Sequence, residues 1–168
     1  LRVLSPGDPK TEFLIFKLSA SQIAKRNLLR EQMKETRPSE SDYFTTGDPF
    51  NFFTAKDLNG NKFNKANLMG KVVIVSFWFI NCPPCNREIP ELNELVKEYE
   101  NNNNVVFLAV ALDSENDLKY FLKKNSFTYH ILPSGRDIAS RYGIHSYPTN
   151  VVISPDGHVK FHTSGYSV

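Results

Sequence analysis

Residues 72–92 read VVIVSFWFINCPPCNREIPEL and contain the only two cysteines of the chain, Cys82 and Cys85. Up to Ile80 this is the most apolar run of the sequence, and it does not alternate with polar residues, which is typical of a strand covered on both faces. Beyond the cysteines, apolar residues recur at helical intervals as far as Tyr99. The stretch therefore predicts a buried central strand that delivers two sulfur atoms to the start of a helix.

Two cysteines separated by two residues favour reversible dithiol–disulfide chemistry. At a helix N-terminus, unpaired N–H groups and the helix dipole stabilise a thiolate, so we expect the pKa of Cys82 to lie below the ~8.5 of a free cysteine. Cys85, one turn further along and more covered, should keep its proton longer. Cys82 would then attack a partner's disulfide, and Cys85 would resolve the mixed disulfide. Pro83 and Pro84 suit the first helical turn because they lack N–H groups.

Two other interpretations of the cysteine pair remain open from the residues alone. The first is a static disulfide or two buried thiols, although a disulfide that closes so short a loop adds little stability. The second is a zinc site that includes His158 and His162. These histidines lie far along the chain on a predicted strand, which is not zinc-finger spacing, so we expect no metal there. His130 and His145 are expected to be surface or loop residues.

Strand and helix signals alternate along the rest of the chain. Asn59-Gly60 between apolar runs predicts a β-hairpin within residues 50–64. Further strands are predicted at residues 105–112, 127–132, 149–153 and 158–162, and further helices at 115–124 and 136–142. Together these elements predict an α/β fold, with a mixed β-sheet covered by helices on both faces.

The first 45 residues are expected to form an N-terminal extension to a domain that spans residues 46–168. Within the extension, residues 12–18 alternate enough to predict a short strand. Residues 19–36 carry apolar side chains at roughly helical intervals among charged ones, which predicts an amphipathic helix.

Charge and hydropathy exclude some classes of partner. Twenty basic and eighteen acidic residues leave a formal charge of +2 with no basic run, so nothing indicates binding to nucleic acid.

No apolar stretch approaches the roughly 20 residues of a membrane helix. The chain opens at Leu1, so we expect that a secretory signal, a lipid anchor or an expression tag has been removed. Membrane contact is expected only through such an anchor.

A longer motif extends from Trp78 to Leu92, with the pattern Trp-x3-Cys-Pro-Pro-Cys-x2-Glu-x-Pro-x-Leu. Later in the chain, Tyr147-Pro148-Thr149 leads into a strand and a Ser-Pro-Asp-Gly turn at residues 154–157. In motif, order and spacing, residues 47–165 resemble the thioredoxin-like thiol–disulfide oxidoreductases of the TlpA/ResA type, within the redoxin or AhpC/TSA-like superfamily. The resemblance implies a thioredoxin-like fold with an N-terminal β-hairpin, to which this chain adds an N-terminal helical segment.

The resemblance also assigns substrate-binding positions. Pro148 matches the cis-proline that faces the cysteine pair in such folds, where the residue before it, Tyr147, offers its backbone to the substrate chain. Pro83, Pro84 and Trp78 complete the expected substrate-binding set. A cis X-Pro bond is uncommon, so residue patterns alone would not have predicted one here.

Glu88 matches the buried active-site glutamate of the ResA-like members. A physical argument points the same way, because Glu88 shares a helix flank with Cys85, Leu92 and Leu95 and should be partly covered. Burial raises the pKa of a carboxyl group, which would let Glu88 take the proton that Cys85 loses during resolution. The alternative is a solvated surface glutamate.

Three features depart from the family pattern. Asn81 stands where many relatives have a tryptophan, which changes the surface offered to a partner. Ser76 occupies the place of the buried aspartate of thioredoxin, so assisted proton transfer would depend on Glu88 or water. The chain ends at Val168, where a closing C-terminal helix would be expected.

The resemblance implies an enzyme, a thiol–disulfide oxidoreductase that acts on protein disulfides through its CPPC dithiol, as a reductant in the periplasm or cell envelope. Its expected partners are protein disulfide or dithiol substrates and a membrane-bound reductase as electron donor, and no cofactor is expected. One alternative is a peroxiredoxin-like peroxide reductase, but Phe79 stands where the threonine of such a site would be. The other is a non-catalytic, metal-binding module with the same fold.

Overall fold

The computed structural model describes residues 40–165. The strand predicted at residues 12–18 and the helix predicted at 19–36 fall outside the described residues. Whether residues 1–45 form a separate extension therefore stays a prediction.

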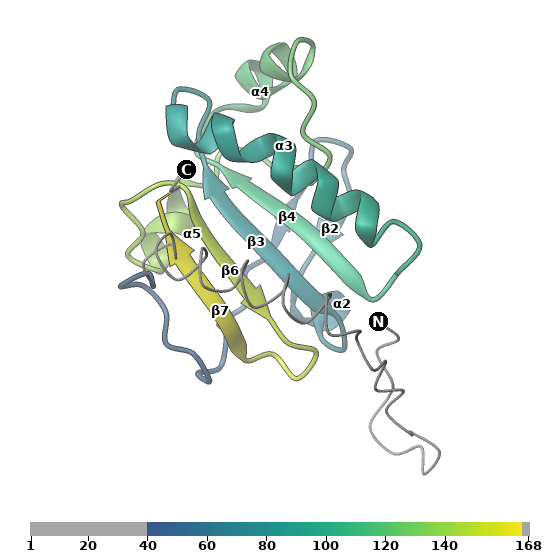
Figure 1. The fold of residues 1–168 in the computed structure, drawn as a ribbon, viewed down its shortest axis with the longest axis vertical. Coiled ribbons are helices and arrows are strands. Elements are labelled where there is room, and N and C mark those ends of the chain that lie inside the picture. Colours follow the sequence, from purple (N-terminus) through teal and green to yellow (C-terminus); the bar gives the residue numbers. More distant parts are fainter. Residues whose placement is uncertain (1–39, 166–168) are drawn as a thin grey trace, which may run out of the picture. The chain divides into compact units, whose positions relative to one another are not determined.

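The central strand is β3 (Val72–Trp78), as the apolar run predicted. It pairs in parallel with β4 (Val105–Ala111) on one side and antiparallel with β6 (Thr149–Ile153) on the other. Beyond them lie β5 (His130–Leu132), parallel to β4, and β7 (Val159–Ser164), antiparallel to β6. The sheet order is thus β5-β4-β3-β6-β7, a mixed sheet in which the most apolar strands are central (Figure 1).

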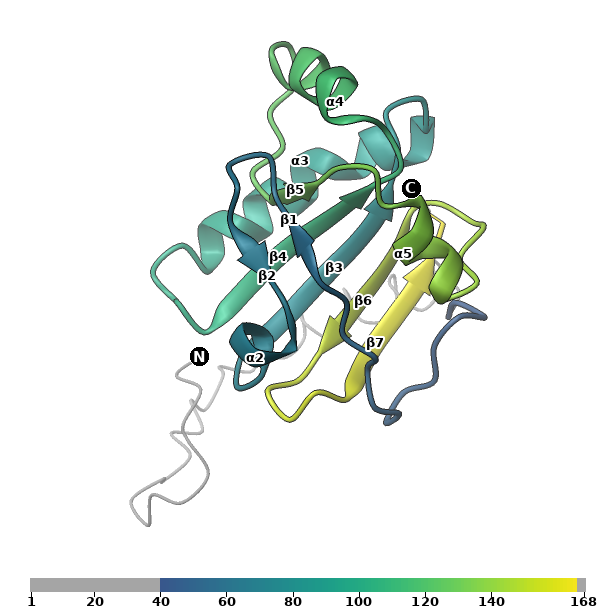
Figure 2. The same ribbon diagram turned by 180° about the vertical axis from the view of Figure 1, so that it is seen from behind.

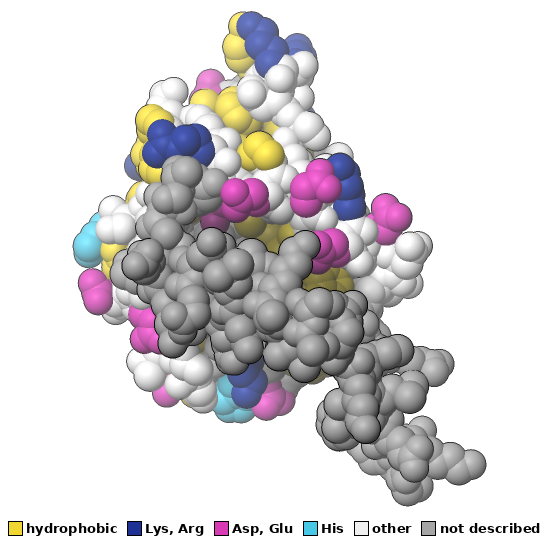
Figure 3. Space-filling view, viewed as in Figure 1, with side chains coloured by type: hydrophobic (Ala, Val, Ile, Leu, Met, Phe, Trp, Pro, Cys, Tyr) yellow, Lys and Arg dark blue, Asp and Glu magenta, His cyan; other side chains and the backbone are white. Residues whose placement is uncertain are grey.

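Helices cover both faces of this sheet, as predicted. The long helix α3 (Pro83–Glu98) crosses one face over β3 and β4 (Figure 1). Seen from behind, α5 (Arg136–Arg141) and the short helix α2 (Lys65–Leu68) lie on the other face (Figure 2). The helix α4 (Glu115–Leu122) is capped by Ser114, whose hydroxyl accepts a hydrogen bond from the Asp117 N–H. Over the α3 face, Figure 3 shows acidic and basic side chains interspersed.

Alternate side chains of β3 supply two hydrophobic cores, one on each side of the sheet. Val73, Val75 and Phe77 pack in the core away from α3. Ile74 and Trp78 pack in the core beneath α3, which also contains both cysteines. The strand therefore connects the cysteine pair to a fully covered sheet.

The predicted hairpin is present but much shorter than expected. It consists of β1 (Ala55–Lys56) and β2 (Lys62–Phe63), while residues 50–53 form no strand. The turn is fixed by Asp57, whose carboxylate accepts hydrogen bonds from the Asn61 N–H at 2.8 Å and the Asn59 N–H at 2.9 Å. Although burial alone would raise the pKa of Asp57, hydrogen bonds, including those from Asn61 and His130, lower it below its ordinary value.

The strand predicted at residues 127–132 is also shorter, since β5 contains only the last three of them. Phe127 and Tyr129 are buried in the core, which explains the apolar pattern there. Between them, the Thr128 N–H donates to the Asn93 side chain of α3 at 2.8 Å instead of to a neighbouring strand. A hydrogen bond from the backbone to a side chain thus takes the place of strand pairing in this segment.

Gly135 marks a close approach that the sequence did not reveal. Its N–H donates to the Ala111 carbonyl at 2.7 Å, at the start of α5. A Cβ atom at this position would lie 2.3 Å from Val110 Cγ1, so α5 can sit against β4 only because residue 135 has no side chain. Within residues 40–165, no helix has the length and apolar character needed to cross a membrane.

Candidate active site

The two cysteines lie where the chain passes from β3 into α3. Cys82 is the N-cap of the helix, with an extended backbone conformation, and Pro83 and Pro84 occupy the first helical positions. Since neither proline has an N–H group, the Cys85 N–H is the first one in the helix that can reach the cap. It donates to Cys82 Sγ at 3.3 Å. The sequence-based placement of Cys82 at the helix start is therefore correct.

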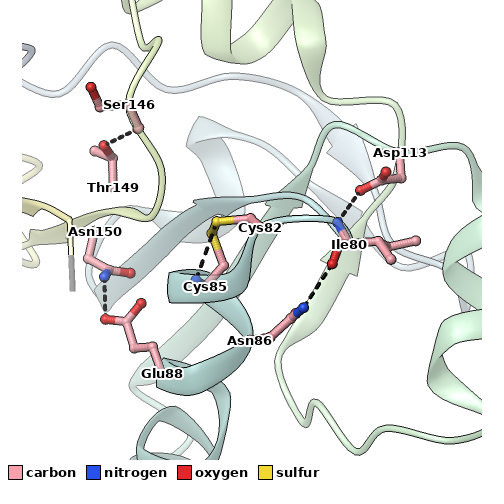
Figure 4. Close-up of a disulfide and its surroundings, with 9 residues drawn as sticks. All are labelled: Ile80, Cys82, Cys85, Asn86, Glu88, Asp113, Ser146, Thr149 and Asn150. Atoms are coloured by element: carbon pink, nitrogen blue, oxygen red, sulfur yellow. Dashed lines mark hydrogen bonds between the residues drawn. A yellow bond between two sulfur atoms is a disulfide. The ribbon is translucent and has the colours of Figure 1, made fainter. Parts of the chain in front are cut away.

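Cys82 and Cys85 are joined in a disulfide, with their Cα atoms 5.2 Å apart (Figure 4). Both residues are buried, with exposed fractions of 3% and 2%. The expected difference in cover between them is thus negligible in this oxidised state. The structure therefore shows the dithiol at the N-terminus of the helix in its oxidised, disulfide form.

The short loop before Cys82 is held by two side chains that the sequence analysis did not single out. The Ile80 N–H donates to Asp113 Oδ2 at 2.8 Å, and the Asn86 side-chain amide donates to the Ile80 carbonyl at 2.8 Å (Figure 4). Asp113 directly follows Leu112, whose N–H donates to the Trp78 carbonyl. The cysteines are therefore positioned by both β4 and α3. An acidic residue at the end of a buried strand was the only available sequence signal for Asp113.

The peptide bond between Tyr147 and Pro148 is cis, as the resemblance implied. After it, the Thr149 hydroxyl donates to the Ser146 carbonyl at 2.8 Å, across the turn that contains this bond. Thr149 pairs with Phe77 near the end of β3, so the turn lies at the same end of the sheet as the cysteines (Figure 4).

The residues expected to bind substrate are not equally accessible. Pro83 is exposed, and Pro84 and Tyr147 are partly exposed. The Tyr147 ring packs edge-on against Phe79 in the loop before the cysteines, with 5.4 Å between ring centroids. Trp78, in contrast, is 1% exposed, since it is enclosed by aromatic rings of the core beneath α3. It offers no surface to a protein substrate in this state, and we exclude it from the proposed binding surface.

Glu88 lies on α3, one turn after Cys85, and reaches toward β6 (Figure 4). Its Oε1 accepts a hydrogen bond of 2.6 Å from Asn150 Nδ2, and its Oε2 is buried without a hydrogen-bond partner. Burial raises the pKa of Glu88 from its ordinary 4.5 to about 7. The Asn150 hydrogen bond opposes this rise, and the charge of Glu91 adds to it. A carboxyl group with this pKa can both accept and release a proton near neutral pH.

Sequence reasoning missed Asn150, which forms part of a polar row across three strands. Asn150 pairs with Ser76 of β3 on one side and with Thr163 of β7 on the other. All three residues are buried, with exposed fractions of 8%, 1% and 5%. A polar residue inside an otherwise apolar strand was the available signal, but only the sheet register shows that Asn150 lies beside Glu88.

The histidines are dispersed and do not form a shared site. The buried His162 accepts a hydrogen bond from the Ser41 N–H at 3.1 Å, and His158 precedes β7. His130 and His145 are both exposed, as expected; His145 contacts a tyrosine hydroxyl, and His130 begins β5. Among residues 40–165, no group of three or more His, Cys, Asp or Glu side chains could hold a metal ion.

Comparison with known proteins places this geometry in a family. Residues 46–162 match the AhpC/TSA family. The chain belongs to this family. One similar AhpC/TSA relative is the thiol-disulfide oxidoreductase ResA of Halalkalibacterium halodurans, 32% identical over 115 residues, which are 67% of this chain and 65% of that protein. Another is the thioredoxin-like protein YneN of Bacillus subtilis, 33% identical over 107 residues, 62% of this chain and 63% of the relative. The chain thus spans somewhat less than two thirds of the length of these relatives.

Solved structures confirm the thioredoxin-like fold of this AhpC/TSA member. A thiol:disulfide interchange protein of the thioredoxin family from Chlorobium tepidum superposes with a TM-score of 0.62 at 26% identity, covering 73% of this chain and 88% of that one. MTB DsbF, solved in mixed oxidised and reduced forms, superposes with a TM-score of 0.58 at 28% identity, covering 68% and 84%. The predicted α/β fold with a mixed sheet and a small antiparallel hairpin is therefore correct.

Proposed function

We propose that this AhpC/TSA family member is an enzyme, a thiol–disulfide oxidoreductase that exchanges disulfides with protein partners through Cys82 and Cys85. The observation that carries the proposal is the disulfide across the first turn of α3, with Cys82 at the helix cap. The names of the similar relatives and structures, thiol-disulfide oxidoreductase and thiol:disulfide interchange protein, support the same reaction class.

In the reduced protein, the Cys85 N–H and the N-terminus of α3 favour the thiolate of Cys82 over its thiol. This thiolate attacks one sulfur of a partner's disulfide, and the partner's other sulfur leaves as a thiolate that takes up a proton. Cys85 then loses its proton and attacks Cys82, which releases the second partner sulfur. The partner's disulfide has gained two electrons, and the Cys82–Cys85 disulfide of this structure is the product.

Glu88 is proposed as the base for the second step. It accepts the proton of Cys85 while the mixed disulfide is resolved, and its pKa of about 7 suits that task because the carboxylate is then populated at neutral pH. Its position one turn beyond Cys85 on the same helix supports this role.

We propose that an extended segment of the partner lies over Pro83, Pro84 and the Tyr147-Pro148 backbone. These residues come from the helix start and from the turn beside it; Pro83, Pro84 and Tyr147 retain exposed surface around the buried disulfide, whereas Pro148 is itself buried. Because both sulfur atoms are covered, access to Cys82 requires the partner chain to approach along this rim. Asn81, exposed at the same rim, would shape the choice of partner.

The direction and place of the reaction are proposed from the resemblance to the TlpA/ResA type. The protein would act as a reductant in the periplasm or cell envelope and would itself be reduced by a membrane-bound reductase. A redox titration against glutathione tests the direction: a potential well below that of the glutathione pool supports a reductant, whereas a higher one indicates an oxidant.

Reduction of insulin disulfides tests the proposed activity. With dithiothreitol as electron source, the wild-type protein should accelerate insulin reduction, and Cys82→Ser and Cys85→Ser should each lose this acceleration. Parallel assays use hydrogen peroxide as oxidant and zinc or copper as ligand. Peroxide consumption without insulin reduction would favour the peroxiredoxin-like reading, and stoichiometric metal binding without turnover would favour a metal-binding module.

A further inference from the structure

The Asn150 side chain donates a hydrogen bond to the proposed base, Glu88. Its Nδ2 lies 2.6 Å from Glu88 Oε1, although 62 positions separate the two residues in sequence. The backbone that carries this side chain is held by the sheet, because Asn150 is the second residue of β6 and pairs with Ser76 and Thr163 on both sides. The donor is therefore presented by the rigid sheet rather than by a loop.

The two oxygens of Glu88 are consequently not equivalent. Oε1 already accepts the Asn150 N–H, and a proton taken up at Oε2 leaves that hydrogen bond in place. Oε2 is buried and has no hydrogen-bond partner. In Figure 4 it lies on the side of the carboxyl group nearer the disulfide.

We propose that Asn150 is a positioning residue, which holds the Glu88 carboxyl group through Oε1 and leaves Oε2 as the atom that takes and releases the proton. This inference rests on the proposed role of Glu88 as the base for Cys85. In the balanced step, the Cys85 thiol gives its proton to Oε2, the resulting thiolate forms the bond to Cys82, and the partner's sulfur leaves.

The contact also adjusts how readily Glu88 ionises. A hydrogen bond to a carboxylate favours the charged form, so the Asn150 amide lowers the pKa that burial raises. Two other ionisable groups interact with Glu88, and of these Glu91 raises its pKa. Glu91 adds a like charge from the same helix. Tyr129, buried in the core beneath α3, has its own pKa raised by burial and by the charge of Glu88. In the oxidised protein the two cysteines carry no titrating proton.

The test is the titration of Glu88 in the oxidised full chain, followed by carboxyl ¹³C NMR and assigned with Glu88→Gln. Asn150→Leu removes the donor but retains a side chain of similar shape, which limits the entry of water. We expect the Glu88 pKa to rise by about 1 unit or more. Asn67→Ala is the control, because it removes side-chain hydrogen bonds of α2 that do not involve Glu88 and should leave the titration unchanged. An unchanged Glu88 pKa in Asn150→Leu would overturn the inference.

A second measurement needs no variant of Asn150. In the wild-type protein, the side-chain amide protons of Asn150 should shift with pH at the Glu88 midpoint, and this shift should vanish in Glu88→Gln. An Asn150 amide signal that does not titrate would overturn the inference even if Asn150→Leu failed to fold.

Kinetics then separate this inference from the proposed function. If the Glu88 pKa rises from about 7 to about 8, the ionised fraction at pH 7 falls about fivefold, and resolution by Cys85 should slow equally and recover near pH 9. A raised pKa with unchanged resolution would support the Asn150 contact but remove Glu88 from the proposed mechanism. A purely structural role for Asn150 would show no recovery at high pH.

Discussion

Glu88 combines two opposing influences on one carboxyl group. Burial of the Glu88 carboxyl group between α3 and the sheet favours its protonated form, whereas the Asn150 amide favours its carboxylate. The balance, a pKa of about 7, is useful to an enzyme that must accept a proton from a thiol and later release it. Two predictions follow from this residue, one kinetic and one thermodynamic.

The kinetic prediction concerns Glu88→Gln. Since Gln cannot accept the proton of Cys85, resolution of the mixed disulfide should slow by up to about 10²-fold, while the initial attack by Cys82 should be nearly unchanged. Stopped-flow fluorescence of Trp78, the only tryptophan, which belongs to the same hydrophobic core as both cysteines, can follow the two steps. Equal slowing of both steps would remove Glu88 from the resolving reaction.

The thermodynamic prediction uses the same variant in the oxidised protein. Because the folded protein raises the Glu88 pKa from 4.5 to about 7, the protonated carboxyl contributes stability that is fully present below about pH 4.5 and is lost as the pH rises through about 7. A glutamine side chain does not titrate, so Glu88→Gln lacks this pH-dependent contribution to stability. Urea unfolding from pH 4 to 8 should therefore show the variant gaining free energy of unfolding relative to wild type. A constant difference across this range would contradict the raised pKa.

At the scale of elements, the junction of β3 and α3 depends on neighbours that are distant in sequence. Asp113, after β4, binds the Ile80 N–H, and Asn86 of α3 binds the Ile80 carbonyl. The position of β4 is in turn coupled to α5 through Gly135, which has no room for a Cβ atom beside Val110. The loop before Cys82 is thus supported by packing on both faces of the sheet.

Gly135→Ala tests this packing. The added methyl group would meet Val110 at 2.3 Å, so α5 must shift away from β4, and we expect a loss of about 1–3 kcal/mol in free energy of unfolding. Thermal or urea unfolding measures it. Ser140→Ala, at an exposed position of the same helix, is the matched control and should change stability by less than about 0.5 kcal/mol. If Gly135→Ala were as stable as wild type, α5 and β4 would not be held rigidly at this close distance.

Local sequence signals predicted the elements that local interactions determine. The apolar run of β3, the Cys82 cap and the two prolines at the start of α3 could be recognised from a few adjacent residues. The strands expected around residues 50–54 and 127–129 were wrong: the Phe50 N–H donates to the Gly157 carbonyl instead of to β2, and the Asn93 side chain accepts the Thr128 N–H. Side-chain hydrogen bonds of this kind have no periodic signal.

At the scale of the whole domain, the candidate site is assembled from segments that only the fold brings together. Cys82, Cys85 and Glu88 follow one another along the chain, whereas Asn150 and the Tyr147-Pro148 bond come from the antiparallel strand β6 and the turn before it. The family resemblance supplied Pro148 and Glu88, but Asn150 became visible only from its register opposite Ser76. Pairing across strands is not encoded in any single short motif.

The proposed function makes Cys82 the attacking thiol of a protein disulfide exchanger. Trapping of a mixed disulfide by reduced Cys85→Ser, with insulin as the disulfide partner, followed by peptide mapping, tests this role most directly. We predict a covalent adduct through Cys82 that dithiothreitol reverses, and no adduct with Cys82→Ser. An adduct through Cys85 in Cys82→Ser, with none in Cys85→Ser, would contradict it.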